Sequence, residues 1–166
     1  MTLTTHTGGC QCGAIRFRAE GEINRASICH CRMCQKAFGG YYAPLVSVRE
    51  VDFQWTRGER KIFRSSNVVS RGFCGDCGTP LTYEAPDGIA IAAGAFDDPS
   101  SVAPTLQFGA EGKIGFVDHL HELPSRRTEE DLQDEPFLAD LASYQHPDHD
   151  TAKWPPNDQP AKDGQP

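Results

Sequence analysis

The chain has 166 residues and a formal charge of −7, and seven of its residues are cysteines. This length predicts one domain with a substantial hydrophobic core. No apolar run is long enough to cross a membrane, and no lysine- and arginine-rich run alternates with aromatic residues, so we expect neither a membrane nor a nucleic acid as partner. The N-terminus lacks the basic and hydrophobic regions of a signal peptide, which favours a cytoplasmic protein.

The charge is divided unevenly along the chain. Residues 128–166 contain ten acidic and two basic side chains, whereas residues 1–77 contain eleven basic and six acidic ones. A positive field attracts anions, and it also offsets the charge of metal-bound thiolates. We therefore expect a domain over residues 1–127, followed by an acidic, proline-rich tail over residues 128–166.

Short β-strands separated by turns account for most of the first 127 residues. Apolar and charged residues alternate at Ile15, Phe17 and Ala19, with the period of two that is typical of a half-buried strand. In chain order, strands are predicted at 15–19, 41–48, 51–55, 68–73, 89–93, 106–108 and 114–117. Glycine- and proline-rich turns lie between them, for example at Gly8-Gly9. The pattern predicts an all-β domain with one short helical turn at 32–37.

The C-terminal tail has a different pattern. Thr128, followed by three acidic residues, is typical of a helix start. Pro136 would interrupt this helix unless it begins a new one. From His146 onward, prolines are interspersed with polar residues, which predicts a mobile segment.

The seven cysteines form three groups, and their number is informative. The groups are Cys10 with Cys12, then Cys29, Cys31 and Cys34, and finally Cys74 with Cys77. In a reducing compartment such clusters favour metal ligation over disulfides. A structural zinc has four protein ligands, whereas a catalytic zinc keeps one position open. Seven thiolates are one short of two closed sites, so we expect two Zn²⁺ ions per chain, one of them with a vacancy.

The spacing indicates how the ligands are shared. The triplet lies within six residues, so one loop can place three sulfurs around an ion. The two remaining pairs then close an S₄ site between distant segments, where metal binding contributes folding free energy. The main competing assignment joins Cys29 and Cys31 to the Cys74/Cys77 pair. Iron–sulfur ligation is a further alternative, although the spacings do not match those of ferredoxins.

The triplet is where we expect chemistry. Three thiolates leave Zn²⁺ with a net charge near −1 and one exchangeable position. Such an ion can bind an incoming thiol as its thiolate, or polarise an aldehyde oxygen. The alternative is a second structural zinc completed by a histidine, for which His119 and His121 are better placed than His30.

Several segments resemble one known family. They are GGCQCGAIRF at 8–17, CHCRMCQKAFGG at 29–40, FCGDCGTPL at 73–81 and GAFDDP at 94–99. In this order they resemble the glutathione-dependent formaldehyde-activating enzyme family, also called the centromere protein V family, over roughly residues 8–120. The resemblance implies a β-tent of small antiparallel sheets built around zinc. It also implies a structural zinc on Cys10, Cys12, Cys74 and Cys77, and a catalytic zinc on Cys29, Cys31 and Cys34.

The implied reaction is the addition of the sulfur of glutathione to formaldehyde, which gives S-(hydroxymethyl)glutathione and serves aldehyde detoxification. The family is classed with carbon–sulfur lyases. Arg32, Lys36 and Arg71 are candidates to bind the carboxylates of glutathione, although solvated charges explain them equally well. Gly39 and Gly40 can let the backbone approach the ligand, and an ordinary turn is the alternative.

Two departures from the family pattern leave the substrate open. Gly115-Phe116 stands where many members have Pro-Trp, and Gln107-Phe108-Gly109 stands where a histidine-led segment is common. The leading hypothesis is a lyase acting on a small-molecule thiol and a small aldehyde. One alternative is a non-catalytic module with two structural zinc ions that binds a thiol or a protein partner. Another is a zinc enzyme with a different thiol or electrophile.

Overall fold

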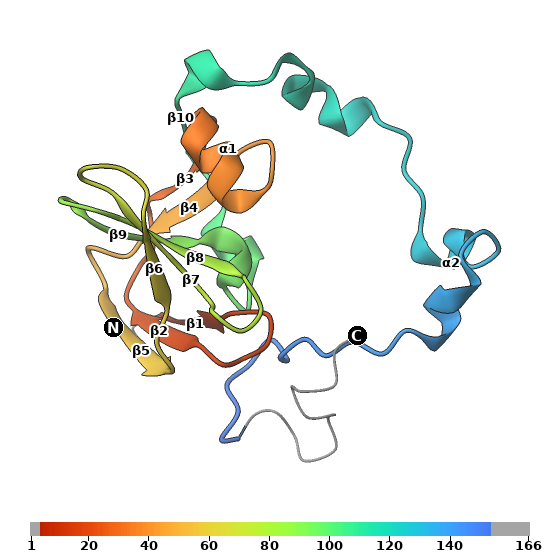
Figure 1. The fold of residues 1–166 in the computed structure, drawn as a ribbon, viewed down its shortest axis with the longest axis horizontal. Coiled ribbons are helices and arrows are strands. Elements are labelled where there is room, and N and C mark those ends of the chain that lie inside the picture. The colour runs from red at the N-terminus through yellow and green to blue at the C-terminus, as the bar shows by residue number, and fades with distance from the viewer. Residues whose placement is uncertain (1–3, 154–166) are drawn as a thin grey trace.

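The computed structural model describes residues 4–153, and most of its regular structure is β-strand (Figure 1). The strands are β1 (Thr5–Gly9), β2 (Arg16–Glu20), β3 (Ala26–Cys29), β4 (Ala43–Ser47), β5 (Asp52–Arg57), β6 (Lys61–Arg64), β7 (Ser70–Phe73), β8 (Pro80–Ala85), β9 (Gly88–Ala92) and β10 (Leu106–Phe108). The α-helices of the described residues are α1 (Arg32–Phe38) and α2 (Thr128–Asp131). Short 3₁₀ helices are found at Ala93–Ala95, Pro99–Val102, Ala110–Gly112, Gly115–Glu122 and Pro136–Asp140.

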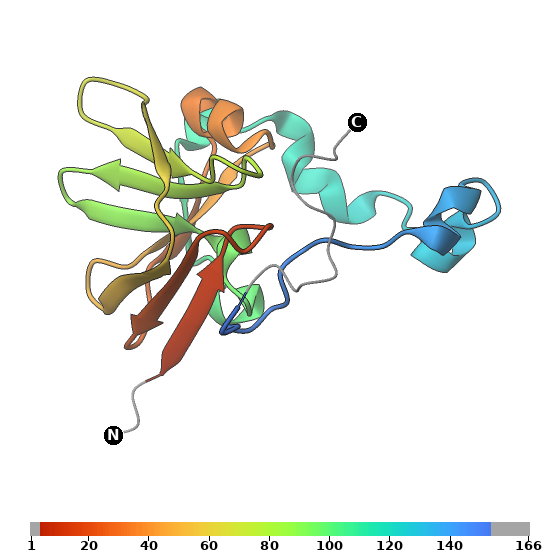
Figure 2. The ribbon, with the colours of Figure 1, turned by 60° about the horizontal axis from the view of Figure 1, so that its bottom comes forward.

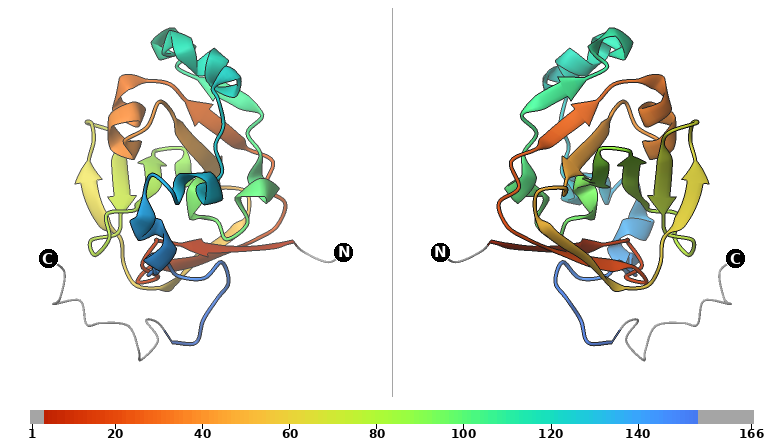
Figure 3. Two further views of the ribbon diagram at one scale, coloured as in Figure 1. Left: turned by 90° about the vertical axis from the view of Figure 1, so that its right-hand side faces the viewer. Right: turned by 90° about the vertical axis from the view of Figure 1, so that its left-hand side faces the viewer.

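The strands form two sheets. One has three strands in the order β1-β2-β5, and the other has seven in the order β10-β3-β4-β9-β8-β7-β6. Neighbouring strands are antiparallel, except that β10 runs parallel to β3. Figures 2 and 3 show the larger sheet curving above the smaller one. This arrangement of antiparallel sheets confirms the all-β prediction.

The hydrophobic core joins the two sheets. Phe17 of β2 is fully buried in the same cluster as Leu81 of β8 and Ile91 of β9. The ring of Phe17 also contacts the ring of Phe96, with centroids 5.1 Å apart. Burying these apolar side chains is favourable and has no directional preference, so the core holds the two sheets together. The turns between the strands then position the polar groups.

Most predicted elements are present, with two corrections. The strands expected around residues 15–19, 41–48, 51–55, 68–73, 89–93 and 106–108 correspond to β2, β4, β5, β7, β9 and β10, and the helical turn is α1. The strand expected at 114–117 is wrong, because the 3₁₀ helix Gly115–Glu122 occupies this stretch. Gly8-Gly9 is not a turn but the end of β1, where a Cβ on Gly8 would lie 2.2 Å from the carbonyl oxygen of Ala95.

Arg16 departs from the alternation of its strand. The pattern placed it on the polar face of β2, but its side chain is only 3% exposed. It makes a bidentate ion pair with Asp97, with N–O distances of 2.5 and 2.7 Å. Thr7 donates a further hydrogen bond to the same carboxylate. A buried guanidinium is tolerated here because a carboxylate pairs with it.

Residues 113–145 leave β10 and arch away from the sheets before returning to them (Figure 1). The helix expected at Thr128 is α2, although its N-cap is Arg127. Pro136 begins the 3₁₀ helix Pro136–Asp140, as its fixed φ allows. No helix among residues 4–153 is long and apolar enough to span a bilayer.

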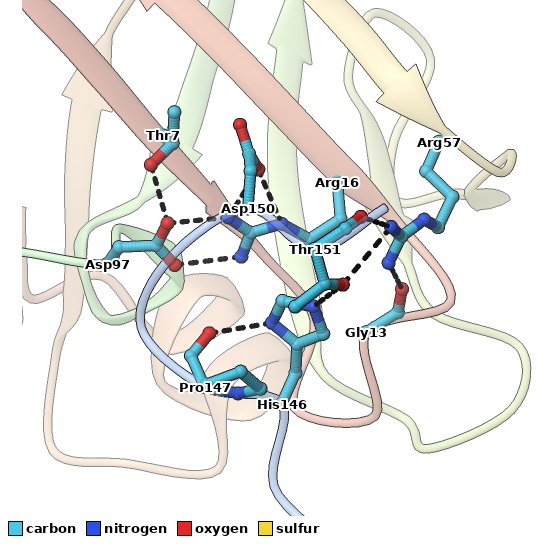
Figure 4. Close-up of polar contacts among 9 residues, drawn as sticks. All are labelled: Thr7, Gly13, Arg16, Arg57, Asp97, His146, Pro147, Asp150 and Thr151. Atoms are coloured by element: carbon cyan, nitrogen blue, oxygen red, sulfur yellow. Dashed lines mark hydrogen bonds and ion pairs between the residues drawn. The ribbon is translucent and has the colours of Figure 1, made fainter. Parts of the chain in front are cut away.

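Residues 146–151, here called the C-terminal strap, pack on the three-stranded sheet (Figure 4). The backbone N–H of His146 donates to the carbonyl of Gln11 at 2.8 Å, and the His146 side chain is 4% exposed. Asp150 pairs with Arg16 at 2.7 Å, and Thr151 accepts hydrogen bonds from Arg57. Residues 146–151 therefore make specific contacts with the sheet, which the predicted mobility from His146 onward did not anticipate. Residues 154–166, to which that expectation also applied, lie outside the described residues.

Candidate metal centres and substrate pocket

The first cysteine cluster is formed by two turns that are far apart in the sequence. Cys10 and Cys12 lie between β1 and β2, and Cys74 and Cys77 lie between β7 and β8, with all four Sγ atoms within 4.8 Å of one another. The Sγ atoms of Cys10 and Cys12 are 3.6 Å apart, and those of Cys12 and Cys74 are 3.8 Å apart. A tetrahedral zinc with Zn–S bonds of about 2.3 Å requires sulfurs about 3.8 Å apart. This four-cysteine cluster therefore fits a tetrahedral ion.

Backbone amides point at the sulfurs of this cluster. The N–H of Ile15 donates to Cys10 Sγ at 3.2 Å, and the N–H of Asp76 donates to Cys74 Sγ at 3.4 Å. Gly78 closes the second turn with a φ of 78°, which side chains with a Cβ adopt only at a cost. Such N–H groups stabilise negative charge on sulfur, as metal-bound thiolates require.

The thiol pKa values indicate how a bound ion would change the protonation of this cluster. Burial raises the pKa of Cys10 and Cys12 above the ordinary value. Burial also opposes the ionisation of Cys77, but hydrogen bonds from Thr79 outweigh it and lower the pKa to about 6. Neighbouring thiolates repel one another, so a divalent cation is the natural means of keeping several of them deprotonated together.

The second cluster is local in sequence. Cys29 ends β3, Cys31 is the residue before α1, and Cys34 lies within α1. Their Sγ atoms lie within 4.8 Å of one another, and no histidine or carboxylate of residues 4–153 joins this group. His119 and His121, the candidates for a fourth ligand, have side chains 65% and 76% exposed. The three-cysteine cluster thus offers three donors to an ion.

Two buried polar side chains hold this cysteine loop in place. Gln35, 5% exposed, donates from Nε2 to the carbonyls of His30 at 2.7 Å and Gly112 at 3.1 Å. The N–H of His30 donates to the carbonyl of Phe108 at 2.9 Å, and its Nε2 lies 2.9 Å from Gln107 Oε1. His30 is therefore directed away from the sulfurs. The sequence analysis assigned no role to Gln35. The signal that could have identified it was its position in the segment at 29–40 that resembles the family.

A pocket of about 510 Å³ opens on the three-cysteine cluster. All three of its cysteines contribute to the lining, together with apolar side chains of β3, β4, β9 and β10. Arg25 and Arg49 also line it, and they pair with Glu50 and Asp87. The sequence analysis did not identify these lining residues, because they come from separate strands that only the folded sheet brings together.

The predicted substrate-binding residues are dispersed. Arg71 of β7 lines the pocket, and its Nη2 donates to Cys34 Sγ at 3.3 Å. Lys36 lines a neighbouring hollow of about 470 Å³ beside Arg32 and Phe63, and Arg71 borders both this hollow and the pocket. Gly39 has a φ of 63° and caps the C-terminus of α1. Neither Gly39 nor Gly40 lines the pocket that contains the cysteines.

The thiols of the three-cysteine cluster also differ in pKa, because their surroundings differ. Burial raises the pKa of Cys29 to about 12. Burial acts in the same direction on Cys31, but backbone and side-chain hydrogen bonds from Cys34, with the positive charge of Arg71, lower its pKa overall. The cluster thus lies beside a fixed cation that favours anionic sulfur.

Comparison with known proteins adds to this geometry. An uncharacterized lyase of Schizosaccharomyces pombe is 31% identical to this chain over 93 residues, which cover 52% of the chain and 62% of that relative. The chain therefore matches less than two thirds of the relative's length. A crystal structure of a Rhodobacter sphaeroides protein covers 61% of this chain and 98% of its own, with 17% identity and a TM-score of 0.44.

The family match covers well over half of the chain. The sequence profile described as glutathione-dependent formaldehyde-activating enzyme matches residues 5–110. This range contains all seven cysteines and both clusters. The chain belongs to the glutathione-dependent formaldehyde-activating enzyme family.

Proposed function

We propose that this chain is a zinc-dependent enzyme of the carbon–sulfur lyase type. It joins a thiol, with glutathione as the first candidate, to formaldehyde or another small aldehyde. The observation that carries the proposal is the three-cysteine cluster, which has no fourth side-chain donor among residues 4–153 and opens on a pocket. Zinc sites with three protein ligands are typical of catalysis, whereas closed sites with four are structural.

The two clusters would have different roles. Cys10, Cys12, Cys74 and Cys77 would hold a structural zinc that joins the two sheets. Cys29, Cys31 and Cys34 would hold the second zinc, which when bound supplies Lewis acidity and lowers the pKa of a thiol. Residues 1–127 would form the catalytic domain. The reducing cytoplasm suits a protein that keeps seven thiols available to metals.

The reaction balances without a further reactant. The thiol sulfur forms a bond to the carbonyl carbon, and the π electron pair of the carbonyl moves to its oxygen. The thiol loses its proton to solvent, and the oxygen takes one up, so the hydroxymethyl thioether contains all atoms of both reactants. The pocket beside the cysteines is large enough for a thiol as well as formaldehyde.

The direct test is product formation. Purified protein is mixed with formaldehyde and glutathione, and NMR follows the S-hydroxymethyl adduct. We expect a rate above that of the uncatalysed addition, which Cys31→Ser abolishes while circular dichroism shows the strands intact. Wild-type protein that loads two zinc ions and gives no acceleration would contradict the proposal, and would favour a non-catalytic module that binds a thiol or a protein partner.

A further inference from the structure

Arg71 is a buried cation with no carboxylate partner in the described part of the chain. Its side chain lies on β7 and is 6% exposed. Nε donates to Ser65 Oγ at 3.1 Å, Nη2 donates to Cys34 Sγ at 3.3 Å, and Cζ lies 5.2 Å from the centroid of the Tyr83 ring. Among residues 4–153 it forms no ion pair with an aspartate or glutamate. A buried charge requires compensation, and the sulfurs are the anionic groups on hand.

The guanidinium also has an unused donor. Nη1 of Arg71 is buried and has no hydrogen-bond partner in the part of the chain that the structure describes. Buried donors are nearly always satisfied, and an unsatisfied one costs stability. Because Arg71 lines the pocket that contains the three cysteines, an acceptor bound there can supply the missing partner.

The other cations near the cysteines do not share this position. Arg25 and Arg49 are paired with carboxylates, and their side chains are 52% and 36% exposed. Arg32 and Lys36 are exposed and line the neighbouring hollow, which Arg71 also borders, but not the pocket that contains the cysteines. Solvent screens such charges, whereas the field of a buried charge is screened much less. Arg71 therefore dominates the electrostatics at the sulfurs.

The charge count shows what Arg71 favours. Three thiolates and one Zn²⁺ sum to −1, and a thiolate as fourth ligand makes the assembly −2. The neighbouring guanidinium attracts the negative charge that the thiolate adds, whereas a neutral fourth ligand adds no charge for it to attract. We propose that Arg71 is a specificity-determining residue that selects an anionic thiolate over neutral ligands at the open position. This inference rests on the proposed function and identifies which form of the substrate the site accepts.

The proposal can be tested by ligand binding without turnover. The protein is loaded with Co²⁺, and visible absorption follows titrations with 2-mercaptoethanol, which binds as a thiolate, and with imidazole, which binds neutral. In Arg71→Met we expect thiol affinity to fall about tenfold or more and imidazole affinity to stay within about twofold. Arg71→Lys, which keeps the charge, should retain most of the selectivity. Arg64→Met removes an exposed charge from neighbouring β6 and should change neither affinity.

The outcomes separate the two proposals. Equal losses for both ligands in Arg71→Met, or no loss for either, would show that Arg71 has only a structural role and would overturn the inference. If the wild-type cobalt protein binds neither ligand, the open position itself is absent, and the proposed function fails with it. Each variant is first shown to hold two cobalt ions, and Arg71→Gln replaces Arg71→Met if the latter does not load.

Discussion

The two cysteine clusters present the same ligand atom from differently connected parts of the chain. The four-cysteine cluster joins turns that are more than sixty residues apart, so an ion there would fix one sheet to the other. The three-cysteine cluster lies within six residues, where the end of β3 and α1 already hold its loop. Because the ligand atoms are the same, we expect the difference in sequence separation to decide which site supports the fold more strongly.

The surroundings of the clusters differ as well. The C-terminal strap bonds to Gln11, between two cysteines of the first cluster, and backbone amides surround its sulfurs. The second cluster opens on a pocket and contacts a buried arginine. Cys10 and Cys77 of the first cluster also line a hollow, of about 430 Å³, so the clusters differ in the number of sulfur donors and in the charge beside them rather than in access alone. We propose a supporting role for the first cluster and a reaction site at the second.

The largest effect should come from breaking the four-cysteine cluster. Cys77→Ser removes one of four ligands from the site that joins the sheets. Structural zinc contributes on the order of 10 kcal/mol in small domains, comparable with the whole stability of a protein of this size, so we expect loss of the fold. Circular dichroism, size-exclusion chromatography and zinc analysis measure it. A folded variant that still holds two zinc ions would refute the assignment.

The matched substitution in the three-cysteine cluster should be milder for the fold. We expect Cys34→Ser to keep the strands, to lose one zinc equivalent and to reduce adduct formation at least about 100-fold, because loss of outer partners alone costs about 10–100-fold at metal sites. Zinc analysis and NMR measure these effects. Equal collapse of Cys34→Ser and Cys77→Ser would remove the distinction between the two clusters.

The C-terminal strap provides a smaller test of the region around the four-cysteine cluster. Ending the chain after Gln145 removes the backbone bond of His146 to Gln11 and the contact of Asp150 with Arg16. We expect a loss of about 1–2 kcal/mol and a fall in Tm of roughly 3–6 °C, with the zinc content unchanged. Differential scanning calorimetry makes the comparison, and a chain ended after Lys153 is the control. Identical Tm values for the two chains would show that the strap does not stabilise the fold.

The smallest expected effect is on the pH dependence of the free energy of unfolding. Burial, with repulsion from Arg16 and Arg57, outweighs the attraction of Asp97 and holds the pKa of His146 below its ordinary value. The strap therefore holds neutral His146, and its stabilisation is complete above the unfolded pKa of about 6.5 and is lost as pH falls below it.

The measurement is denaturant unfolding between pH 7.5 and 5.5. We expect His146→Gln to flatten the pH dependence by less than about 1 kcal/mol over this range. The carboxylate of Asp97, whose pKa burial would raise but the Arg16 guanidinium and Thr7 hydroxyl lower, titrates well below this window and does not interfere. A wild-type slope that the substitution leaves unchanged would assign the pH dependence to other groups.

The sequence by itself determined the all-β class, the position of most strands and the grouping of the cysteines into four and three. These features depend on neighbouring residues or on simple counts. Apolar residues repeat at every second position of a strand, and the spacing of the cysteines limits which sulfurs can share an ion. The strand predicted at 114–117 was wrong, because a short apolar run has no fixed preference without neighbours.

Only the tertiary structure decided what surrounds each cluster. It buried Arg71 against Cys34, 37 residues away in sequence, and left Lys36 and Gly39-Gly40, which are close in sequence, outside the pocket. It also paired Arg16 with Asp150 across 134 residues. Such contacts arise when sheets close over a common core, and the periodicity of a single strand carries no information about the strand that will face it.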